Sequence, residues 1–373
     1  MDEELKLFRP AIARVVEREF VPHQPRWRAQ HRPDADAWLK AGQAGMLLVD
    51  LPAEFGGGGG SFVHEAIVVE ELAKAGVNFA SYVHDGVAHY IHAYGREEQK
   101  RDLLPRMAAG ELVGAVALTE PSAGSDLQGI RMTAKRVGDD YIINGSKTFV
   151  TNGSLMGLVC LAVRTDPAAP PIRGISLLLV ETEGLAGFAR GQPLEKVGMH
   201  GQDTCEVFFD EVRVPASCLL GNKEGQGFAQ IMERMIYERL AIGVIAVATM
   251  ETAVRLTSTY VKERMAYGAP LLELQNTRMK LAECATKARV GRVFLDECVD
   301  RFVAGQLDSV AAAQVKYWLT DCECEVVDEC VQLHGGYGYM TEYEIARMWA
   351  DSRVHRIFAG ANEVLKEVIA WSL

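Results

Sequence analysis

The sequence predicts an α+β protein in which helices come first, an antiparallel β region follows, and a helical bundle ends the chain. Apolar residues recur with a helical period up to about residue 112, with a period of two from Gly114 to Val214, and with the helical period again from Gly225. Turn-forming residues separate the middle runs at the short intervals of antiparallel sandwiches and barrels. We therefore expect an N-terminal helical domain at 1–112, a central antiparallel β domain at 113–218 and a C-terminal helical bundle domain at 219–373.

The expected elements follow in order from these periods. In the first part, the clearest helical segments are Val63–Ala75 and His89–Ala108. The strand-like runs of the middle part lie between Gly, Pro, Asp and Asn turns and comprise Met132–Val137, Tyr141–Ile143, Thr148–Val150, Leu158–Val163, Ile175–Val180 and Glu206–Val214. Gly and Pro residues divide the last part into helical segments at 225–264, 271–304, 308–333, 343–350 and 361–371.

Composition and charge exclude several classes of protein. Hydrophobic residues make up 49% of the 373 residues and charged residues 24%, as in ordinary globular proteins. The 39 basic and 50 acidic residues give a net charge of −11, which argues against nucleic acid and anionic membranes as general partners. No run approaches about 18 uninterrupted apolar residues, so we expect no membrane span.

The cysteines, the N-terminus and the histidines indicate a reducing compartment and no metal site. The 8 cysteines lack paired C-x-x-C spacing, so we expect reduced thiols. The acidic start, Met1–Leu5, is unlike a signal or transit peptide, which predicts a cytoplasmic protein, or one of the mitochondrial matrix if the chain is a processed eukaryotic form. No two of His84, His89 and His92 share a helix face at i, i+4, so we expect no zinc site.

Two polar segments, Leu118–Asp126 and Asn144–Gly153, follow strand-like runs of the middle domain. Both are rich in hydroxyl groups, small residues and turn formers, and such loops present N–H and O–H donors to ligands. Phe149 and Thr151 are two residues apart, so in a strand both side chains leave the same face. An aromatic ring beside a hydroxyl group suits a flat ligand with heteroatoms at its edge. The alternative is a hairpin with a polar turn.

Glu238 occupies an apolar position of the helical segment that begins at Gly225. The stripe expected to be buried there is Ile231, Met235, Glu238, Ile242 and Ile245. A carboxylate facing a packed interior costs several kcal/mol unless it is paired or neutral, and burial raises its pKa toward that of a usable general base. Glu238 is therefore a candidate base, or else the partner of an arginine in a structural ion pair, with Arg239 adjacent in sequence.

Taken together, these features resemble the acyl-CoA dehydrogenase family over essentially the whole chain. The segments that carry the resemblance, in the family's order, are Leu118–Pro121 with Gly124–Asp126, Asn144–Lys147 with Phe149–Gly153, Arg264 with Tyr267–Gly268, Gln275, and Gln332–Gly336. The resemblance implies an N-terminal helical domain, a central β domain and a C-terminal four-helix bundle, with FAD between the β domain and the bundle. It also implies a homo-oligomer, usually a tetramer.

The resemblance assigns cofactor and substrate contacts to particular residues. Phe149 and Thr151 would flank the flavin ring, and Arg264 and Gln275 would reach the diphosphate of FAD in a neighbouring subunit. The implied FAD contacts are Val116, Leu118, Thr119, Ser125, Phe149, Val150, Thr151, Arg264, Gln275, Gln332, Leu333, Gly335, Gly336, Ala361 and Glu363. The implied contacts to an acyl-CoA substrate are Ser125, Tyr237, Arg239, Ala359 and Gly360.

The position of the catalytic base departs from the commoner family pattern. Many members carry the base in a Tyr-Glu-Gly-Thr segment near the C-terminus, but the matching position here is Ala359, which cannot take a proton. The long-chain and isovaleryl types place it in a Glu-Arg-Leu segment of the first bundle helix, which here is Glu238–Leu240. The comparison and the apolar stripe therefore both indicate Glu238. The C-terminal half is most similar to the long-chain type.

The implied reaction is α,β-dehydrogenation of an acyl-CoA to a trans-2-enoyl-CoA. Glu238 would remove the α-proton, the β-hydride would pass to flavin N5, and an electron-transfer flavoprotein would reoxidise the flavin. A flavin oxidase or monooxygenase on the same fold remains an alternative, as does a dehydrogenase of branched, terpenoid or carrier-protein-bound acyl groups. A catalytically silent flavin-binding assembly protein is the alternative outside the enzymes.

Overall fold

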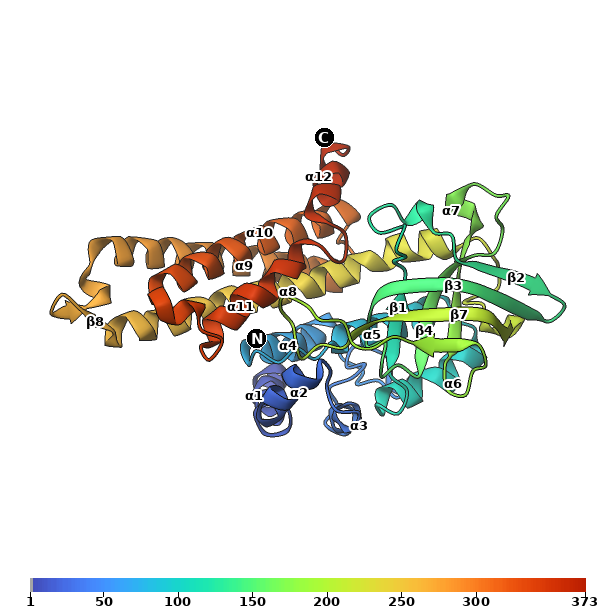
Figure 1. Ribbon diagram of the computed structural model, residues 1–373, viewed down its shortest axis with the longest axis horizontal. Helices are drawn as coiled ribbons and strands as arrows, with labels where there is room; N and C mark the ends of the chain where they lie inside the picture. The colour runs from blue at the N-terminus through green and yellow to red at the C-terminus, as the bar shows by residue number, and fades with distance from the viewer. Residues whose placement is uncertain (1–2) are drawn as a thin grey trace. The chain divides into compact units, whose positions relative to one another are not determined.

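The computed structural model describes residues 3–373, which divide into two compact units (Figure 1). The first comprises the described residues up to Glu65, Asn78–Glu195 and His200–Met235, and it holds most of the N-terminal helices and the main sheet. The second comprises Ala66–Val77, Lys196–Met199 and Ile236–Leu373, and it is almost entirely helical. The predicted order of helices, sheet and helices is confirmed.

The N-terminal region is helical, with one break that the sequence pattern did not predict. Its helices are α1 (Glu3–Glu19), α2 (Gln24–Gln30), α3 (Asp36–Gln43), α4 (Phe62–Lys74), α5 (Ser81–Tyr94) and α6 (Glu97–Ala108). The single helix predicted at 89–108 is wrong, because Gly95 and Arg96 are extended and separate α5 from α6. The N–H of Arg96 donates to Oε1 of Gln99 at 3.0 Å, which caps the start of α6.

The first unit contains a 7-stranded sheet in the order β1-β4-β2-β3-β7-β6. The seventh strand, β5, lies off this path and pairs with β4. Its strands are β1 (Gly114–Ala117), β2 (Thr133–Val137), β3 (Asp140–Thr151), β4 (Leu158–Arg164), β5 (Ile175–Glu181), β6 (Phe188–Arg190) and β7 (Thr204–Pro215). A four-residue helix, α7 (Pro171–Gly174), precedes β5. Strands β4 and β5 are buried along almost their whole length and lie at the core of this unit.

The sheet differs from the predicted one in two respects. The pairs β2–β3, β3–β7, β4–β5 and β6–β7 are antiparallel as predicted, but β1 and β4 are parallel neighbours. Parallel pairing needs a long connection, and the chain between β1 and β4 supplies it through β2 and β3. Within the polar segment at 144–153, the strand predicted at Thr148–Val150 is confirmed, but the loop predicted before it is wrong. Strand β3 runs through it to Thr151, with register shifts at Ile143/Gly145 and Lys147/Val150.

His84 connects the last two N-terminal helices to the sheet. It lies on α5 and is 0% exposed. Its Nδ1 accepts the N–H of Gly114 at 2.9 Å, so Nε2 carries the hydrogen and donates to the carbonyl of Met107 at 3.1 Å. Burial lowers the pKa of His84 to about 4. The residue is thus a neutral structural bridge. Across residues 3–373, no group of three or more His, Cys, Asp or Glu residues is arranged to hold a metal ion.

The second unit is built around α10, which packs against α9, α11 and α12. The helices of the C-terminal part are α8 (Gly227–Glu263), α9 (Gln275–Val303), α10 (Ser309–His334), α11 (Glu344–Ser352) and α12 (Asn362–Ala370). Figure 1 shows α9, α10 and α11 running beside one another. The short strands β8 (Met265–Ala266) and β9 (Ala269–Pro270) form a hairpin between α8 and α9. All the helical segments predicted from Gly225 onward are confirmed.

Helix α8 is long and apolar enough to cross a membrane by length and composition alone. However, 72% of its most apolar window is buried inside the protein. Its composition is accordingly that of a core helix, and apolar residues such as Leu240, Val247 and Met250 are completely buried.

We predict that His84 makes stability depend on pH between about 4 and 6.5. The folded state cannot take up the proton that the unfolded state binds in this window, so stability should fall as the pH falls, by up to roughly 3 kcal/mol. Urea unfolding at several pH values measures this slope. His84→Asn should be less stable but should show a flatter slope, since its side chain does not titrate. Equal slopes in the two proteins would contradict the assignment.

Candidate active site

A buried ion pair joins the two polar segments of the first unit. Nζ of Lys147, on β3, lies 2.9 Å from Oε1 of Glu120, and the two side chains are 0% and 5% exposed. Nζ of Lys147 also donates to the carbonyl of Leu118 at 2.9 Å. The N–H of Thr148 donates to the carbonyl of Thr119 at 2.9 Å. The loop that follows β1 is therefore attached to β3 through both side-chain and backbone bonds.

The Glu120 carboxylate is fully engaged in this junction. Besides Lys147, it accepts the N–H groups of Arg131 at 2.8 Å and Met132 at 3.0 Å. Burial lowers the pKa of Lys147 to about 8, while the Glu120 charge opposes that shift. An ammonium group inside the protein is tolerated because a carboxylate and a carbonyl accept its hydrogens.

The bulge in β3 turns Phe149 outward. Phe149 has a left-handed backbone with φ of 58°, which is uncommon for a bulky residue, and its side chain is 66% exposed. Val150 is buried at 1%, and Thr151, which pairs with Thr204 of β7, is half-buried. This alternation agrees with the predicted common face of Phe149 and Thr151. The bulge that precedes it was not predicted.

The remaining predicted residues of the first unit lie on or near its surface. Val116, Leu118 and Thr119 are half-buried, and Ser125 is exposed. Val116 lies within β1, and the other three follow it in the loop that the Lys147–Glu120 ion pair attaches to β3. Thr119 and Ser125 provide hydroxyl groups on this stretch, and the exposed aromatic ring of Phe149 lies on β3, to which the stretch is bonded. Such groups suit a planar ligand with polar edges.

The second unit brings several other predicted residues together at the C-terminal end of α10. The Arg264 guanidinium lies 5.3 Å from the ring centroid of Tyr337, just beyond Gly335 and Gly336. Gly335 ends α10 with φ of 59°, a conformation that favours glycine. Gly336 has no such φ, and a Cβ added there would meet no atom within 4 Å. The chain's own packing therefore does not require glycine at 336, and bare backbone beside an arginine suits an anionic group.

Solvent exposure distinguishes the residues around this end of α10. Gln275 begins α9 and is exposed, as are Arg264 and Gln332, whereas Leu333 is half-buried. Next to them, Tyr260 donates through its hydroxyl to the carbonyl of His334 at 3.1 Å. Exposed polar residues in this position agree with the predicted contact to a ligand or to a second subunit.

Glu238 lies on α8 beside Arg239 but is less buried than the apolar stripe predicts. Glu238 is half-buried, although its Oε1 is shielded from solvent. Tyr237 and Arg239 are buried at 2% and 6%. Burial lowers the pKa of Arg239, and the nearby Glu238 charge opposes that shift. Glu238 is thus more exposed than Ile231, Met235 and Ile242 of the same stripe, which are all buried.

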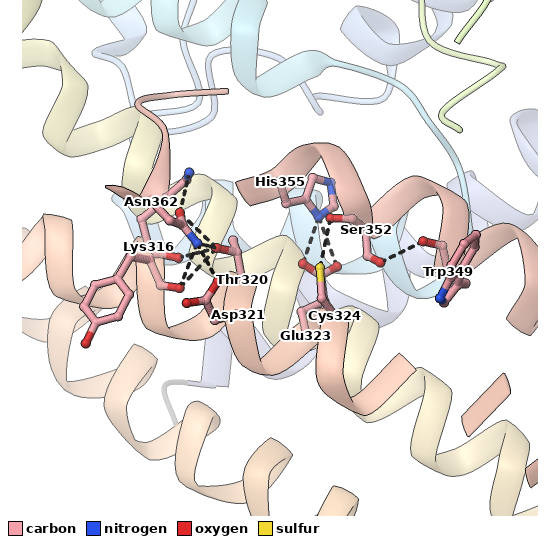
Figure 2. Close-up of polar contacts among 10 residues, drawn as sticks. Lys316, Thr320, Asp321, Glu323, Cys324, Trp349, Ser352, His355 and Asn362 are labelled. Atoms are coloured by element: carbon pink, nitrogen blue, oxygen red, sulfur yellow. Dashed lines mark hydrogen bonds and ion pairs between the residues drawn. The ribbon is translucent and has the colours of Figure 1, made fainter. Parts of the chain in front are cut away.

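The segment that carries Ala359 and Gly360 forms a left-handed turn held against α10. The φ angles of Ala359 and Gly360 are 52° and 91°. Nζ of Lys316 donates to the carbonyl of Gly360 at 2.8 Å. It also donates to Oδ1 of Asn362 at 2.9 Å (Figure 2). A Cβ built on Gly360 would lie 3.8 Å from NH2 of Arg239, so the turn is close to the residue that follows Glu238.

Sequence reasoning did not single out Lys316 as a site residue. Lys316 is 0% exposed, and burial together with Arg239 lowers its pKa to about 7. Asn362 is also 0% exposed, and Ala361 and Glu363 beside it begin α12. The sequence signal for Lys316 is weaker than the one that identified Glu238, because Thr320 and Glu323 place further polar residues on the same face of the helix.

Comparison with known proteins matches almost the whole chain to one family. The models of the N-terminal, middle and C-terminal domains of acyl-CoA dehydrogenases match residues 2–111, 115–212 and 225–373. The mitochondrial long-chain specific acyl-CoA dehydrogenase of Sus scrofa is 44% identical over 368 residues, which are 98% of this chain and 85% of that protein.

Solved structures give the same result. An acyl-CoA dehydrogenase from Geobacillus kaustophilus is 43% identical with a TM-score of 0.97, over 100% of this chain and 98% of that chain. A glutaryl-CoA dehydrogenase from Mycobacterium smegmatis, in complex with FADH2, is 26% identical with a TM-score of 0.93, over 100% and 95% of the two chains.

We predict that the Lys147–Glu120 pair is required for stability of the first unit. Lys147→Met leaves a buried carboxylate without its cation, so the free energy of unfolding should fall by roughly 3 kcal/mol or more. Arg213→Met is the control, because Arg213 pairs with Asp140 at 2.7 Å but is 60% exposed, and its loss should change stability by less than about 1 kcal/mol. Equal losses in urea unfolding would contradict the prediction.

Proposed function

Because this chain belongs to the acyl-CoA dehydrogenase family, whose members are oxidoreductases of CH–CH bonds, we propose that it dehydrogenates acyl-CoA thioesters of medium to long chain length to trans-2-enoyl-CoA. Glu238 is the proposed base for the α-proton. The similarity to long-chain relatives supports the substrate class. We expect the protein to act as a homo-oligomer, with an electron-transfer flavoprotein as its electron acceptor.

One observation carries the proposal for the base. In the helical unit, Arg239 lies close to Gly360, which places the part of α8 that carries Glu238 near the turn that holds Ala359. Ala359 provides no carboxylate there, whereas Glu238 provides one that is shielded at Oε1. A partly desolvated carboxylate is the kind of group that removes a proton near neutral pH.

The family is FAD-dependent, and the residues of this chain fit that cofactor. FAD, when bound, supplies the acceptor for the substrate hydride at its N5. We propose that the exposed ring of Phe149 and the hydroxyl of Thr151 contact the isoalloxazine, with Val116, Leu118, Thr119, Ser125 and Val150 nearby. Arg264, Gln275 and the open backbone at Gly336 suit the diphosphate of FAD in a neighbouring subunit, with Gln332, Leu333 and Gly335 beside them. Ala361 and Glu363 are further proposed FAD contacts.

The thioester carbonyl needs hydrogen-bond donors when Glu238 removes the α-proton. Negative charge then develops on the carbonyl oxygen, and preorganised N–H groups stabilise it. We propose that the backbone N–H of Ala359 is such a donor. No described residue accepts a hydrogen bond from this N–H, and the left-handed turn fixes its direction. A backbone donor is independent of the side chain, so alanine serves at this position. Ser125, Tyr237, Arg239 and Gly360 are the other proposed substrate contacts.

We predict that acyl-CoA bleaches the flavin absorbance of the purified holoprotein in the absence of oxygen. The test panel contains acyl thioesters of CoA with short to long chains, straight and branched, and acyl groups bound to a carrier protein. We expect the fastest bleaching with medium or long straight-chain CoA thioesters. Fast oxygen consumption without another acceptor would favour the alternative of a flavin oxidase or monooxygenase. Bleaching chiefly by branched, terpenoid or carrier-bound acyl groups would change the substrate class. No bleaching by any thioester would favour the catalytically silent assembly protein.

We predict that Glu238→Gln retains bound FAD but lowers the rate of bleaching by at least about 100-fold, since the amide cannot accept the α-proton. Glu233→Gln is the matched control, because Glu233 lies on the same helix but is exposed. Stopped-flow absorbance with a saturating substrate measures both rates. An unchanged rate in Glu238→Gln would exclude this residue as the base.

A further inference from the structure

Three polar residues follow one face of α10 at helical spacing: Lys316, Thr320 and Glu323. Each lies about one turn from the next, and all three are 0% exposed. A buried helix face ordinarily carries aliphatic side chains, because a buried polar group without partners is strongly unfavourable. Besides the bonds of Thr320 to carbonyls of its own helix, each of the three has a partner in one segment, residues 355–362, which leads from the end of α11 to the start of α12. Figure 2 shows the partners His355 and Asn362.

The first contact fixes the C-terminal end of this segment. Lys316 holds the carbonyl of Gly360 and the side chain of Asn362, as described above. Nδ2 of Asn362 in turn donates to Oγ1 of Thr320 at 2.9 Å and to Oδ1 of Asp321 at 2.9 Å. Asn362 is thus bonded on both sides of its amide, and its backbone cannot shift without breaking several buried hydrogen bonds.

The second contact fixes the N-terminal end. Nδ1 of His355 lies 2.9 and 3.0 Å from the two carboxylate oxygens of Glu323, and the side chains are 3% and 0% exposed. The His355 ring also stacks on Phe358, with centroids 5.4 Å apart and planes 10° from parallel. Phe358 directly precedes Ala359. The His355–Glu323 contact therefore positions the residue from which the left-handed turn begins.

The turn between these contacts is not a conformation that its own residues favour. A non-glycine residue with φ near 52°, as at Ala359, has a strained backbone. Such backbone persists when its surroundings hold it, and here both ends are held by buried polar groups of one helix. The free N–H of Ala359 is the group whose direction this arrangement determines.

We propose that Lys316 and the Glu323–His355 pair are positioning residues that aim the N–H of Ala359 at the thioester carbonyl of the substrate. This inference rests on the proposed function, because it assumes that the N–H is the carbonyl donor. Neither residue touches the reacting atoms. Lys316 acts through the carbonyl of Gly360, and Glu323 acts through His355 and Phe358. Since Arg239 also lies beside Gly360, the same contacts hold the turn in register with the helix that carries Glu238.

The experiment replaces each contact separately in the FAD-loaded protein. Lys316→Met keeps the length of the side chain and removes its hydrogen bonds. His355→Phe keeps a ring to stack on Phe358 but removes the bond to Glu323. Lys366→Met is the matched control, since Lys366 pairs with Asp321 at 3.2 Å but is 49% exposed. The readouts are FAD content, kcat, KM and the carbonyl stretching frequency of a bound isotope-labelled enoyl-CoA.

We expect Lys316→Met and His355→Phe to bind FAD, to lower kcat by about 10- to 100-fold with little change in KM, and to shift the carbonyl stretch toward its frequency in water. Lys366→Met should resemble the wild type. A merely structural role would reduce FAD content or stability without moving the carbonyl frequency of the protein that remains folded. If Lys316→Met fails to fold, His355→Phe decides the question alone.

Two outcomes would overturn the inference, and they differ. If the wild type is bleached by acyl-CoA while both variants keep its kcat and carbonyl frequency, the positioning role is wrong and the proposed function stands. If no acyl-CoA bleaches the wild type, the proposed function fails, and the positioning role fails with it.

Discussion

Fully buried lysine side chains hold the backbone where it departs from ordinary conformations, and the candidate site depends on them. Lys147 donates to the carbonyl of Leu118, and Lys147 itself precedes the left-handed Phe149 by two residues. Lys316 binds the carbonyl of Gly360 next to the left-handed Ala359. In each unit an ammonium group inside the core thus fixes a short stretch of strained chain, and the residue in that stretch is the one with a proposed role toward cofactor or substrate.

The two lysines differ in how their charge is balanced. Glu120 directly faces Lys147, whose pKa falls only to about 8. Lys316 is bonded to neutral oxygens, has Arg239 nearby, and its pKa falls further, to about 7. A lysine that is partly neutral at pH 7 still donates hydrogen bonds to the carbonyl of Gly360 and to Asn362. Its role in the turn accordingly depends on geometry more than on charge.

Periodicity could predict the order of the elements because it depends only on which side chains are buried. It also singled out Glu238, since one carboxylate in an apolar stripe is visible without a structure. It could not predict the parallel pairing of β1 with β4, because pairing across a long connection leaves no local pattern. Nor could it show that β3 continues through Asn144–Thr151, since the bulges that permit this depend on the facing strand β7.

The change to alanine at 359 separates two chemical tasks. Where a glutamate occupies this position, one residue would offer both a carboxylate base and a backbone donor. Here the proposed base lies on α8 and the proposed donor on the segment before α12, so their relative placement depends on contacts between two elements. Arg239 beside Gly360 and Lys316 between α10 and the turn supply those contacts within the helical unit. Because the proposed base and the proposed donor lie on different elements, a buried polar network is needed to hold the two in place relative to each other.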